Sequence, residues 1–148
     1  MGHTNAKLVI HAVFSTKGRE PIADDALRAR LFAYVGGITR EEGATAIRIN
    51  GPADHAHLLI QYPAKLNVAD LMRVIKTNSS RWMKEEGAPG FAWQTGYSAF
   101  SVSHDRIDTI IGYIDNQEEH HKKQSFQDEL RWFLRLHGIE PQEDYLWD

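Results

Sequence analysis

Hydrophobic and polar positions alternate along four stretches of the chain, and each alternation predicts a β-strand. Two longer stretches repeat hydrophobic positions every three or four residues, as an amphipathic helix does. Turn residues such as Gly, Pro, Asn and Asp separate these stretches. In chain order, the pattern predicts strand 7–15, helix 24–42, strand 44–50, strand 54–62, a helix that begins at Asn67, and strand 96–103.

The order of these elements, β-α-β-β-α-β, is that of an α+β fold of the ferredoxin-like type. In that topology both helices cover one face of an antiparallel sheet, and the first and third strands are neighbours in its centre. The apolar residues of the third strand would face the helices, because side chains alternate between the two faces. His55 and His57 would lie on the open face, near His11 of the first strand. A third amphipathic helix, predicted over 105–123, is the obvious cover for that face.

The chain ends in a further helical segment, capped by Ser125, and a short tail. We find no internal repeat, low-complexity stretch or linker. We therefore expect one domain, with 1–124 as its body and 125–148 as a C-terminal helical extension. The last 44 residues hold 11 acidic and 5 basic side chains, which predicts that this end of the chain points away from any surface that faces phosphate.

Composition excludes some classes of protein. The chain has no cysteine, so disulfides and thiolate metal sites are ruled out. The net charge of −3 gives no compositional support for nucleic-acid binding. No hydrophobic run reaches the roughly 20 residues that span a bilayer, and the N-terminus shows no secretory signal. We therefore expect no membrane association and a cytoplasmic location.

Two histidines one residue apart, His55 and His57, stand at the head of the third strand. On one face of a strand they lie about 6 to 7 Å apart at the backbone. Both imidazoles can then ligate one metal ion, although a chance pair of exposed histidines has the same spacing. On the predicted third helix, Tyr113 and Gln117 lie one turn apart, beside the isoleucine stripe that packs on the sheet. A helix across the open face would bring this pair over the histidines.

Together these features resemble the HUH single-tyrosine transposases, which are the small insertion-sequence transposases and their REP-associated relatives. Ala56 departs from the bulkier apolar residue that this family often has between its two histidines. Each matching segment is weak alone, but five in the right order and spacing are specific. The resemblance covers roughly Leu8 to His120, and its segments are HAVFSTKGRE, DHAHLLI, LMRVIKTNSSRWM, FAWQTGYSAFSVS and YIDNQEEHH.

The resemblance implies that the protein cleaves and rejoins single-stranded DNA at hairpin-bearing element ends. Tyr113 would attack the scissile phosphate and form a 5′-phosphotyrosine, which retains the bond energy for rejoining. His55, His57 and Gln117 would hold a divalent metal, Mg²⁺ or Mn²⁺, that neutralises charge on the phosphate. Family members act as dimers, which implies a homodimer here.

Other residues carry weaker expectations. The family places basic residues near the DNA after its first strand, where Lys17 and Arg19 stand here. Lys76 and Arg81, on the polar face of the second helix, are further candidates for phosphate contacts, although a solvated helix face explains them equally well. Accessory roles near the metal are open to three more histidines: His11, His120 and His121.

Three alternative hypotheses stay open. A replication-initiator or relaxase-type HUH nickase uses the same chemistry, but the short chain and the Y-x-x-x-Q arrangement favour a transposase. A non-catalytic ferredoxin-like module could bind hairpin DNA or RNA with its open sheet face, yet such modules carry aromatic residues there, where this chain has histidines and Gln61. A small metal-dependent hydrolase would need a general-base carboxylate, and Asp54 is the one adjacent in sequence.

Overall fold

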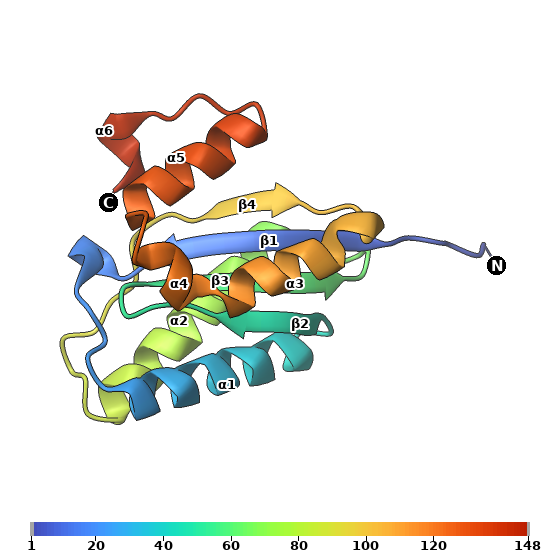
Figure 1. The fold of residues 1–148 in the computed structure, drawn as a ribbon. Helices are drawn as coiled ribbons and strands as arrows, with labels where there is room; N and C mark the ends of the chain where they lie inside the picture. Colours follow the sequence, from blue (N-terminus) through green and yellow to red (C-terminus); the bar gives the residue numbers. More distant parts are fainter. Residues whose placement is uncertain (1, 148) are drawn as a thin grey trace.

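The computed structural model describes residues 2–147 (Figure 1). Met1 and Asp148, the outer ends of the predicted segments 1–124 and 125–148, lie outside the described residues. Four strands form one antiparallel sheet in the order β2-β3-β1-β4, which confirms the ferredoxin-like prediction. The strands are β1 (Leu8–Ser15), β2 (Thr45–Asn50), β3 (His55–Tyr62) and β4 (Ser98–Ser101).

One face of the sheet is covered by α1 (Asp25–Glu41) and α2 (Val68–Glu85) (Figure 1). Both helices begin where the sequence predicts, because the side chains of Asp24 and Asn67 accept hydrogen bonds from first-turn amides. Between these helices and the sheet lies the main hydrophobic core. The strand β3 contributes its apolar positions to that core, namely Ala56, Leu58 and Ile60.

The turn between β2 and β3 determines how the histidine strand enters the sheet. A side chain at Gly51 would place its Cβ 2.2 Å from the backbone oxygen of His55. Atoms that are not bonded to each other cannot approach so closely, so the backbone would have to move. Glycine is required here because the chain passes too close to β3 for any side chain.

The opposite face of the sheet is covered by two separate helical units (Figure 1). A short 3-10 turn, η2 (His104–Arg106), leads into α3 (Ile107–Asp115), which lies against β2 and β3. After α4 (Gln117–His121), the chain crosses to α5 (Phe126–Leu136), whose hydrophobic side chains pack with residues of β1 and β4. The third helix therefore covers only part of the face, and the C-terminal extension covers the rest.

The single helix predicted over 105–123 is wrong, because the helix breaks at Asn116. This residue has φ and ψ of −101° and 24°, and its amide contacts two carbonyl oxygens, those of Gly112 and Tyr113. Asparagine favours such breaks because its side chain competes with the helical backbone for hydrogen bonds. The break separates α3 from α4 and gives the residues of α4 their own orientation.

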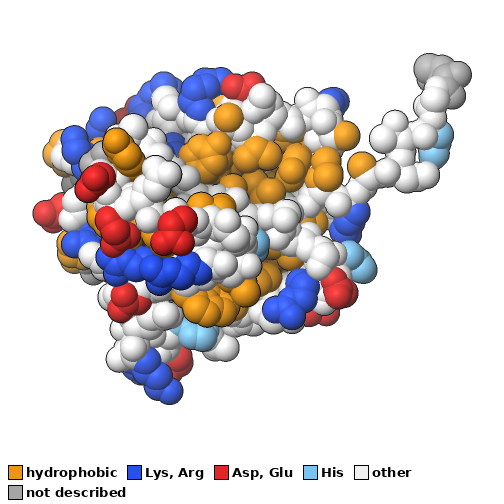
Figure 2. All heavy atoms as spheres, turned by 90° about the horizontal axis from the view of Figure 1, so that it is seen from above, with side chains coloured by type: hydrophobic (Ala, Val, Ile, Leu, Met, Phe, Trp, Pro, Cys, Tyr) orange, Lys and Arg blue, Asp and Glu red, His pale blue; other side chains and the backbone are white. Residues whose placement is uncertain are grey.

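Around α5 and the short α6 (Glu143–Leu146), the surface mixes charged and apolar side chains. Figure 2 shows hydrophobic side chains between charged ones on the side of the molecule where these two helices lie. Within residues 2–147, no helix has both the length and the apolar character needed to cross a membrane. The large exposed apolar side chains of this region are Trp132, Leu136, Ile139 and Tyr145.

Candidate active site

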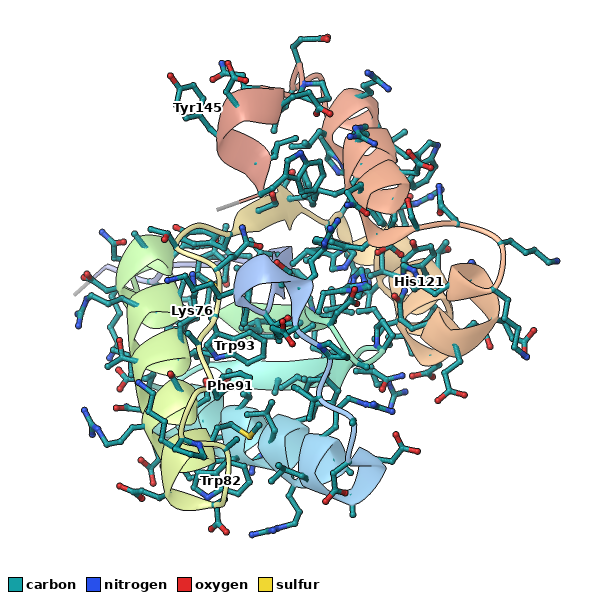
Figure 3. All side chains as sticks on the ribbon, turned by 90° about the vertical axis from the view of Figure 1, so that its left-hand side faces the viewer. Lys76, Trp82, Phe91, Trp93, His121 and Tyr145 are labelled. Atoms are coloured by element: carbon teal, nitrogen blue, oxygen red, sulfur yellow. The ribbon has the colours of Figure 1, made fainter. Side chains whose placement is uncertain are left out.

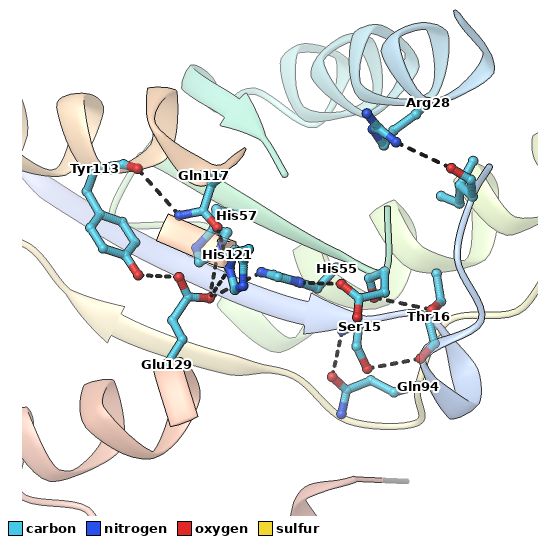
Figure 4. A network of polar contacts seen from close by, with 12 residues as sticks. Ser15, Thr16, Arg28, His55, His57, Gln94, Tyr113, Gln117, His121 and Glu129 are labelled. Atoms are coloured by element: carbon cyan, nitrogen blue, oxygen red, sulfur yellow. Dashed lines mark hydrogen bonds and ion pairs between the residues drawn. The ribbon is translucent and has the colours of Figure 1, made fainter. Parts of the chain in front are cut away.

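Side chains from three parts of the chain converge on the face of β3 that points away from α1 and α2 (Figure 4). His55 and His57 come from β3 and are fully buried. His121 comes from α4, and Glu129 comes from α5 with only 1% of its surface exposed. Each offers one ligand atom, and the four atoms lie within 4.8 Å of one another. This cluster is the candidate metal site.

The distances within the cluster fit a metal ion. Glu129 Oε1 lies 3.1 Å from Nε2 of His55, 3.1 Å from Nε2 of His57 and 3.3 Å from Nε2 of His121. Donor atoms that bind one ion at about 2.1 Å lie about 3.0 Å apart in an octahedron and about 3.4 Å apart in a tetrahedron. The three separations fall in or close to this range, so Oε1 of Glu129 lies at the distance expected between two ligands of one ion from each of the three imidazoles.

In both His55 and His57, Nδ1 points away from the cluster and has a partner that favours metal binding by Nε2. Nδ1 of His55 lies 2.8 Å from Oδ1 of Asp54, and Nδ1 of His57 lies 2.8 Å from Nε2 of His11. Since a carboxylate only accepts hydrogen bonds, Nδ1 of His55 carries a proton. Whenever the ring is neutral, its lone pair is therefore on Nε2, where it can bind a metal. Histidines that bind metals are oriented by such outer hydrogen bonds.

Burial and neighbouring groups set the charges in the cluster. Burial, together with the nearby His57, holds the pKa of His11 well below its usual value and favours the neutral ring. Nε2 of neutral His11 can accept a hydrogen bond from Nδ1 of His57. Burial also lowers the pKa of His57. For His55, hydrogen bonds to Asp54 and Glu129 outweigh the effect of burial and raise the pKa. The strand histidines therefore differ in charge tendency because they differ in their partners.

Glu129 is an anion in spite of its burial. Burial alone would raise its pKa, but hydrogen bonds with His121, His55 and His57 outweigh this effect and hold the pKa far below the usual range. The carboxylate therefore keeps its negative charge at neutral pH. A buried anion that faces three imidazoles is a favourable environment for a cation.

The predicted nucleophile contacts the same carboxylate (Figure 4). The hydroxyl of Tyr113 donates a hydrogen bond to Oε2 of Glu129, the oxygen that faces away from the histidines. Burial and the negative charge of Glu129 raise the pKa of Tyr113, so the hydroxyl keeps its proton. His120 stacks on the tyrosine ring, with the two ring centroids 4.3 Å apart. Tyr113, His55 and His57, which were singled out in the sequence, thus lie together.

Gln117, the predicted third ligand, is buried at the edge of the cluster. Its Oε1 lies 3.1 Å from Nε2 of His121, and its amide donates to the backbone oxygen of Tyr113 at 3.4 Å. Gln117 thus touches the cluster through His121, at a separation that also fits two neighbouring ligands of one ion. The three accessory candidates also lie at this site: His121 belongs to the metal cluster, His11 contacts His57, and His120 stacks on Tyr113.

Lys17 and Arg19 are exposed in η1 (Lys17–Arg19), directly after β1. Arg19 lines a cleft of about 490 Å³ whose wall also includes Asp54 and His121. The backbone of Arg19 has a φ of 56°, a left-handed conformation that is unfavourable for a residue with a side chain. The cleft therefore reaches the metal cluster at His121, and Arg19 is part of the same wall.

The second pair of basic candidates, Lys76 and Arg81, lies on α2. Figure 3 shows Lys76 near Trp93 and well apart from His121. The ammonium of Lys76 donates to the backbone oxygens of Thr95 and Gly96, at 3.1 and 2.7 Å, and burial lowers its pKa to about 8. Lys76 therefore has an internal partner in the segment before β4, whereas Arg81 is exposed.

Sequence reasoning missed Glu129, and the expectation that the acidic C-terminal end points away from the site is wrong for this residue. The helix α5 packs on the sheet through Phe126, Leu130 and Phe133. Glu129 lies three residues after the first of these, on the same face of the helix, so packing carries it inward. A carboxylate within the apolar stripe of a helix is the signal that could have found it. Asp54 was weighed as a general base, whereas it orients His55.

Comparison with known proteins agrees with the resemblance seen in the sequence. A family model described as transposase, IS200-like, matches residues 4–117. A protein from Deinococcus radiodurans R1, described as a candidate transposase, is similar in structure, with a TM-score of 0.65, 24% identity, and coverage of 79% of this chain and 96% of that one. A REP-associated tyrosine transposase bound to a REP hairpin is also similar, with a TM-score of 0.61, 12% identity, and coverage of 82% and 74%. Among curated proteins, none matches this sequence.

Proposed function

Because the chain belongs to the IS200-like transposase family, we propose that it cleaves and rejoins single-stranded DNA at hairpin-bearing ends through a phosphotyrosine on Tyr113. The observation that carries this proposal is the position of the Tyr113 hydroxyl at a buried cluster suited to a divalent metal. In this proposal His55, His57 and Gln117 are metal ligands, as the resemblance implies, and the metal is Mg²⁺ or Mn²⁺. His121 and Glu129 belong to the same cluster.

The proposed chemistry is a transfer of one phosphate ester to another. The oxygen of Tyr113 forms a bond to phosphorus while the bond from phosphorus to the 3′ oxygen breaks, which leaves a 3′-hydroxyl and a 5′-phosphotyrosine. A bound divalent ion supplies the positive charge that this reaction needs at the phosphate oxygens. The chain itself holds the tyrosine ring against His120 and directs the hydroxyl proton towards Oε2 of Glu129.

The DNA would reach the site through the cleft beside His121. Arg19 lines this cleft, and Lys17 is exposed in the same turn, so both are proposed to contact the phosphate backbone. Lys76 and Arg81 are proposed as a more distant contact region on α2. The solved REP-associated relative was bound to a REP hairpin, which supports hairpin DNA as the partner to test first.

A homodimer is the second part of the proposal. Dimerisation buries apolar surface, and the C-terminal helix exposes Trp132 and Leu136, with 52% and 60% of their surface accessible. Light scattering on the purified protein checks the mass in solution. A monomer at all concentrations would contradict this part and leave the proposed chemistry intact.

The test of the chemistry uses the full chain, Mn²⁺ and a pool of single-stranded oligonucleotides that form hairpins. We expect a covalent adduct on a denaturing gel, which mass spectrometry assigns to Tyr113. The adduct should be absent with Tyr113→Phe, suppressed by EDTA, and strongly reduced with His57→Ala. Tyr145→Phe, which changes a tyrosine that is 75% exposed, is the matched control and should react like the wild type.

Two outcomes would contradict the proposal. An adduct that persists in Tyr113→Phe would mean that another residue is the nucleophile. Tight hairpin binding with no adduct, unchanged by the substitutions at Tyr113 and His57, would instead support a non-catalytic binding module.

A further inference from the structure

We propose that Glu129 joins the metal site to the nucleophile: its Oε1 is a metal ligand and its Oε2 holds the hydroxyl of Tyr113. The family match ends at Gln117, so the proposed residue stands on a helix beyond the matched segment. The ligand half of this inference stands on the geometry of the cluster alone. The half that concerns Tyr113 rests on the proposed function.

The burial of Glu129 is the first argument. A carboxylate that is removed from water is costly unless positive charge compensates it. Within residues 2–147, the ion-pair partners of Glu129 are three imidazoles, from His55, His57 and His121, and no lysine or arginine. A neutral imidazole carries no charge, and the neutral ring of His55, whose proton is on Nδ1 beside Asp54, cannot also donate from Nε2 to Glu129. A divalent cation among these four groups would supply the compensation that the protein itself supplies only in part.

The second argument is that the two carboxylate oxygens of Glu129 have different partners. Oε1 faces the three Nε2 atoms at 3.1 to 3.3 Å, whereas Oε2 accepts the hydrogen bond of Tyr113. A carboxylate that ligates a metal through one oxygen keeps the other free as an acceptor. The same side chain can therefore bind the ion and fix the direction of the phenol, with no rearrangement between the two tasks.

The rigidity of the helix that carries Glu129 is the third argument. Ser125 caps α5 by accepting a hydrogen bond from the amide of Asp128. The neighbouring side chains Phe126, Leu130 and Phe133 are buried against the sheet. A packed helix fixes the position of a side chain better than a loop does. The carboxylate of Glu129 is therefore held in place beside the three histidines.

The donor set also indicates the class of metal. Three imidazole nitrogens with one carboxylate, even with the amide oxygen of Gln117 added, suit first-row transition ions such as Mn²⁺ better than Mg²⁺, which prefers oxygen ligands and keeps its waters. We therefore use Mn²⁺ as the probe and expect weaker binding of Mg²⁺ by the same protein.

The first experiment measures Mn²⁺ binding by electron paramagnetic resonance and calorimetry, without DNA. Glu129→Gln keeps the size of the side chain and removes its charge, and we expect at least about tenfold weaker binding. Glu119→Gln is the matched control, because Glu119 is exposed and pairs with Lys122. Tyr113→Phe should bind Mn²⁺ as the wild type does. Equal binding by wild type and Glu129→Gln would overturn the ligand assignment.

The second experiment needs no variant, which matters if Glu129→Gln folds poorly. Hydrogen exchange of the wild-type protein is followed with and without Mn²⁺. If Glu129 is a ligand, the ion ties α5 to the sheet, and amides of residues 126–136 exchange more slowly. If the ion displaces the carboxylate, these amides exchange faster. Faster or unchanged exchange would overturn the inference.

The third experiment tests the contact with Tyr113 through the rate of adduct formation. A role as ligand alone would be rescued in Glu129→Gln by saturating Mn²⁺. We expect instead that adduct formation stays at least about tenfold slower at saturating Mn²⁺. Full recovery of the rate would overturn the Tyr113 half. If the wild type forms no adduct with any hairpin, the proposed function fails, while the binding and exchange measurements still decide the ligand half.

Discussion

On the side of β3 that meets α1 and α2, Leu58 and Ile60 are buried among hydrocarbon side chains. On the other side of the same strand, His55 and His57 are buried just as deeply but face nitrogen, oxygen and charge. The first face stabilises the fold through the hydrophobic effect. The second is polar at His55 and His57 and hydrophobic at Leu59, which packs with Val9 and Ile114. Its polar groups are costly to bury and are tolerated because each has a partner; within the described residues no buried side-chain nitrogen or oxygen lacks one. From His55 to Leu58, residues of the candidate metal site therefore alternate with residues of the hydrophobic core.

Leu58→Ala should destabilise the apolar face of β3 more than the other substitutions do. Leu58 is fully buried, and the cavity left by such a change costs about 3 to 4 kcal/mol of unfolding free energy. Urea denaturation measures this loss. Leu136→Ala, on a leucine that is 60% exposed, should cost less than about 1 kcal/mol. Under native conditions the folded molecules should bind Mn²⁺ as tightly as before, and a parallel loss of Mn²⁺ affinity would contradict the division between the two faces.

Gly51→Ala tests the turn that both faces share. The new Cβ would meet the backbone oxygen of His55 at 2.2 Å, so the strand must shift, at a cost of about 2 kcal/mol. Because the shift moves His55 itself, we expect weaker Mn²⁺ binding as well as lower stability. Gly90→Ala, where nothing lies within 4 Å of the new atom, is the matched control and should change neither quantity. Normal stability of Gly51→Ala would mean that the turn relaxes without strain.

The apolar face and the helix starts follow from local pattern, which is why the sequence predicts them. Alternation with period two assigns the two faces of β3, and the capping side chains of Asp24, Asn67 and Ser125 mark where three helices begin. These signals depend on neighbours a few residues apart. They therefore predict the elements, their order and the pair His55 and His57 on one face.

The polar face depends on contacts between distant residues, which local pattern does not encode. Glu129 reaches the site only because α5 packs on β1 and β4, and the acidic end of the chain gave no hint of this. His121 reaches it after the helix breaks at Asn116, where the sequence pattern predicts an unbroken helix. Both misses concern how elements are placed in three dimensions, since tertiary packing decides which face a short helix buries.

Asp54→Asn tests whether the partner of His55 Nδ1 contributes to metal binding on the polar face. The carboxylate of Asp54 holds Nδ1 of His55 at 2.8 Å, and loss of such a partner weakens metal binding about tenfold, or about 1.4 kcal/mol. Calorimetry with Mn²⁺ measures the effect. Asp70→Asn, an exposed carboxylate on α2, is the control. If Asp54→Asn binds Mn²⁺ like the wild type, the contact does not orient the ligand.

The smallest expected effect is on the pH dependence of stability, measured with a chelator present. Burial and His57 lower the pKa of His11 in the folded state, whereas in the unfolded chain the pKa of His11 is about 6.5. Below about pH 6.5, His11 is protonated in the unfolded state but stays neutral in the folded state. The stability associated with neutral His11 is therefore present above about pH 6.5 and is lost as the pH falls. His11→Gln keeps an acceptor for Nδ1 of His57 and removes this titration. We expect its unfolding free energy to fall less than that of the wild type between pH 7 and pH 5, whereas His104→Gln, at an exposed position, should follow the wild type. An unchanged slope in His11→Gln would assign the acid sensitivity of this face to His57, the other strand histidine whose pKa is lowered by burial.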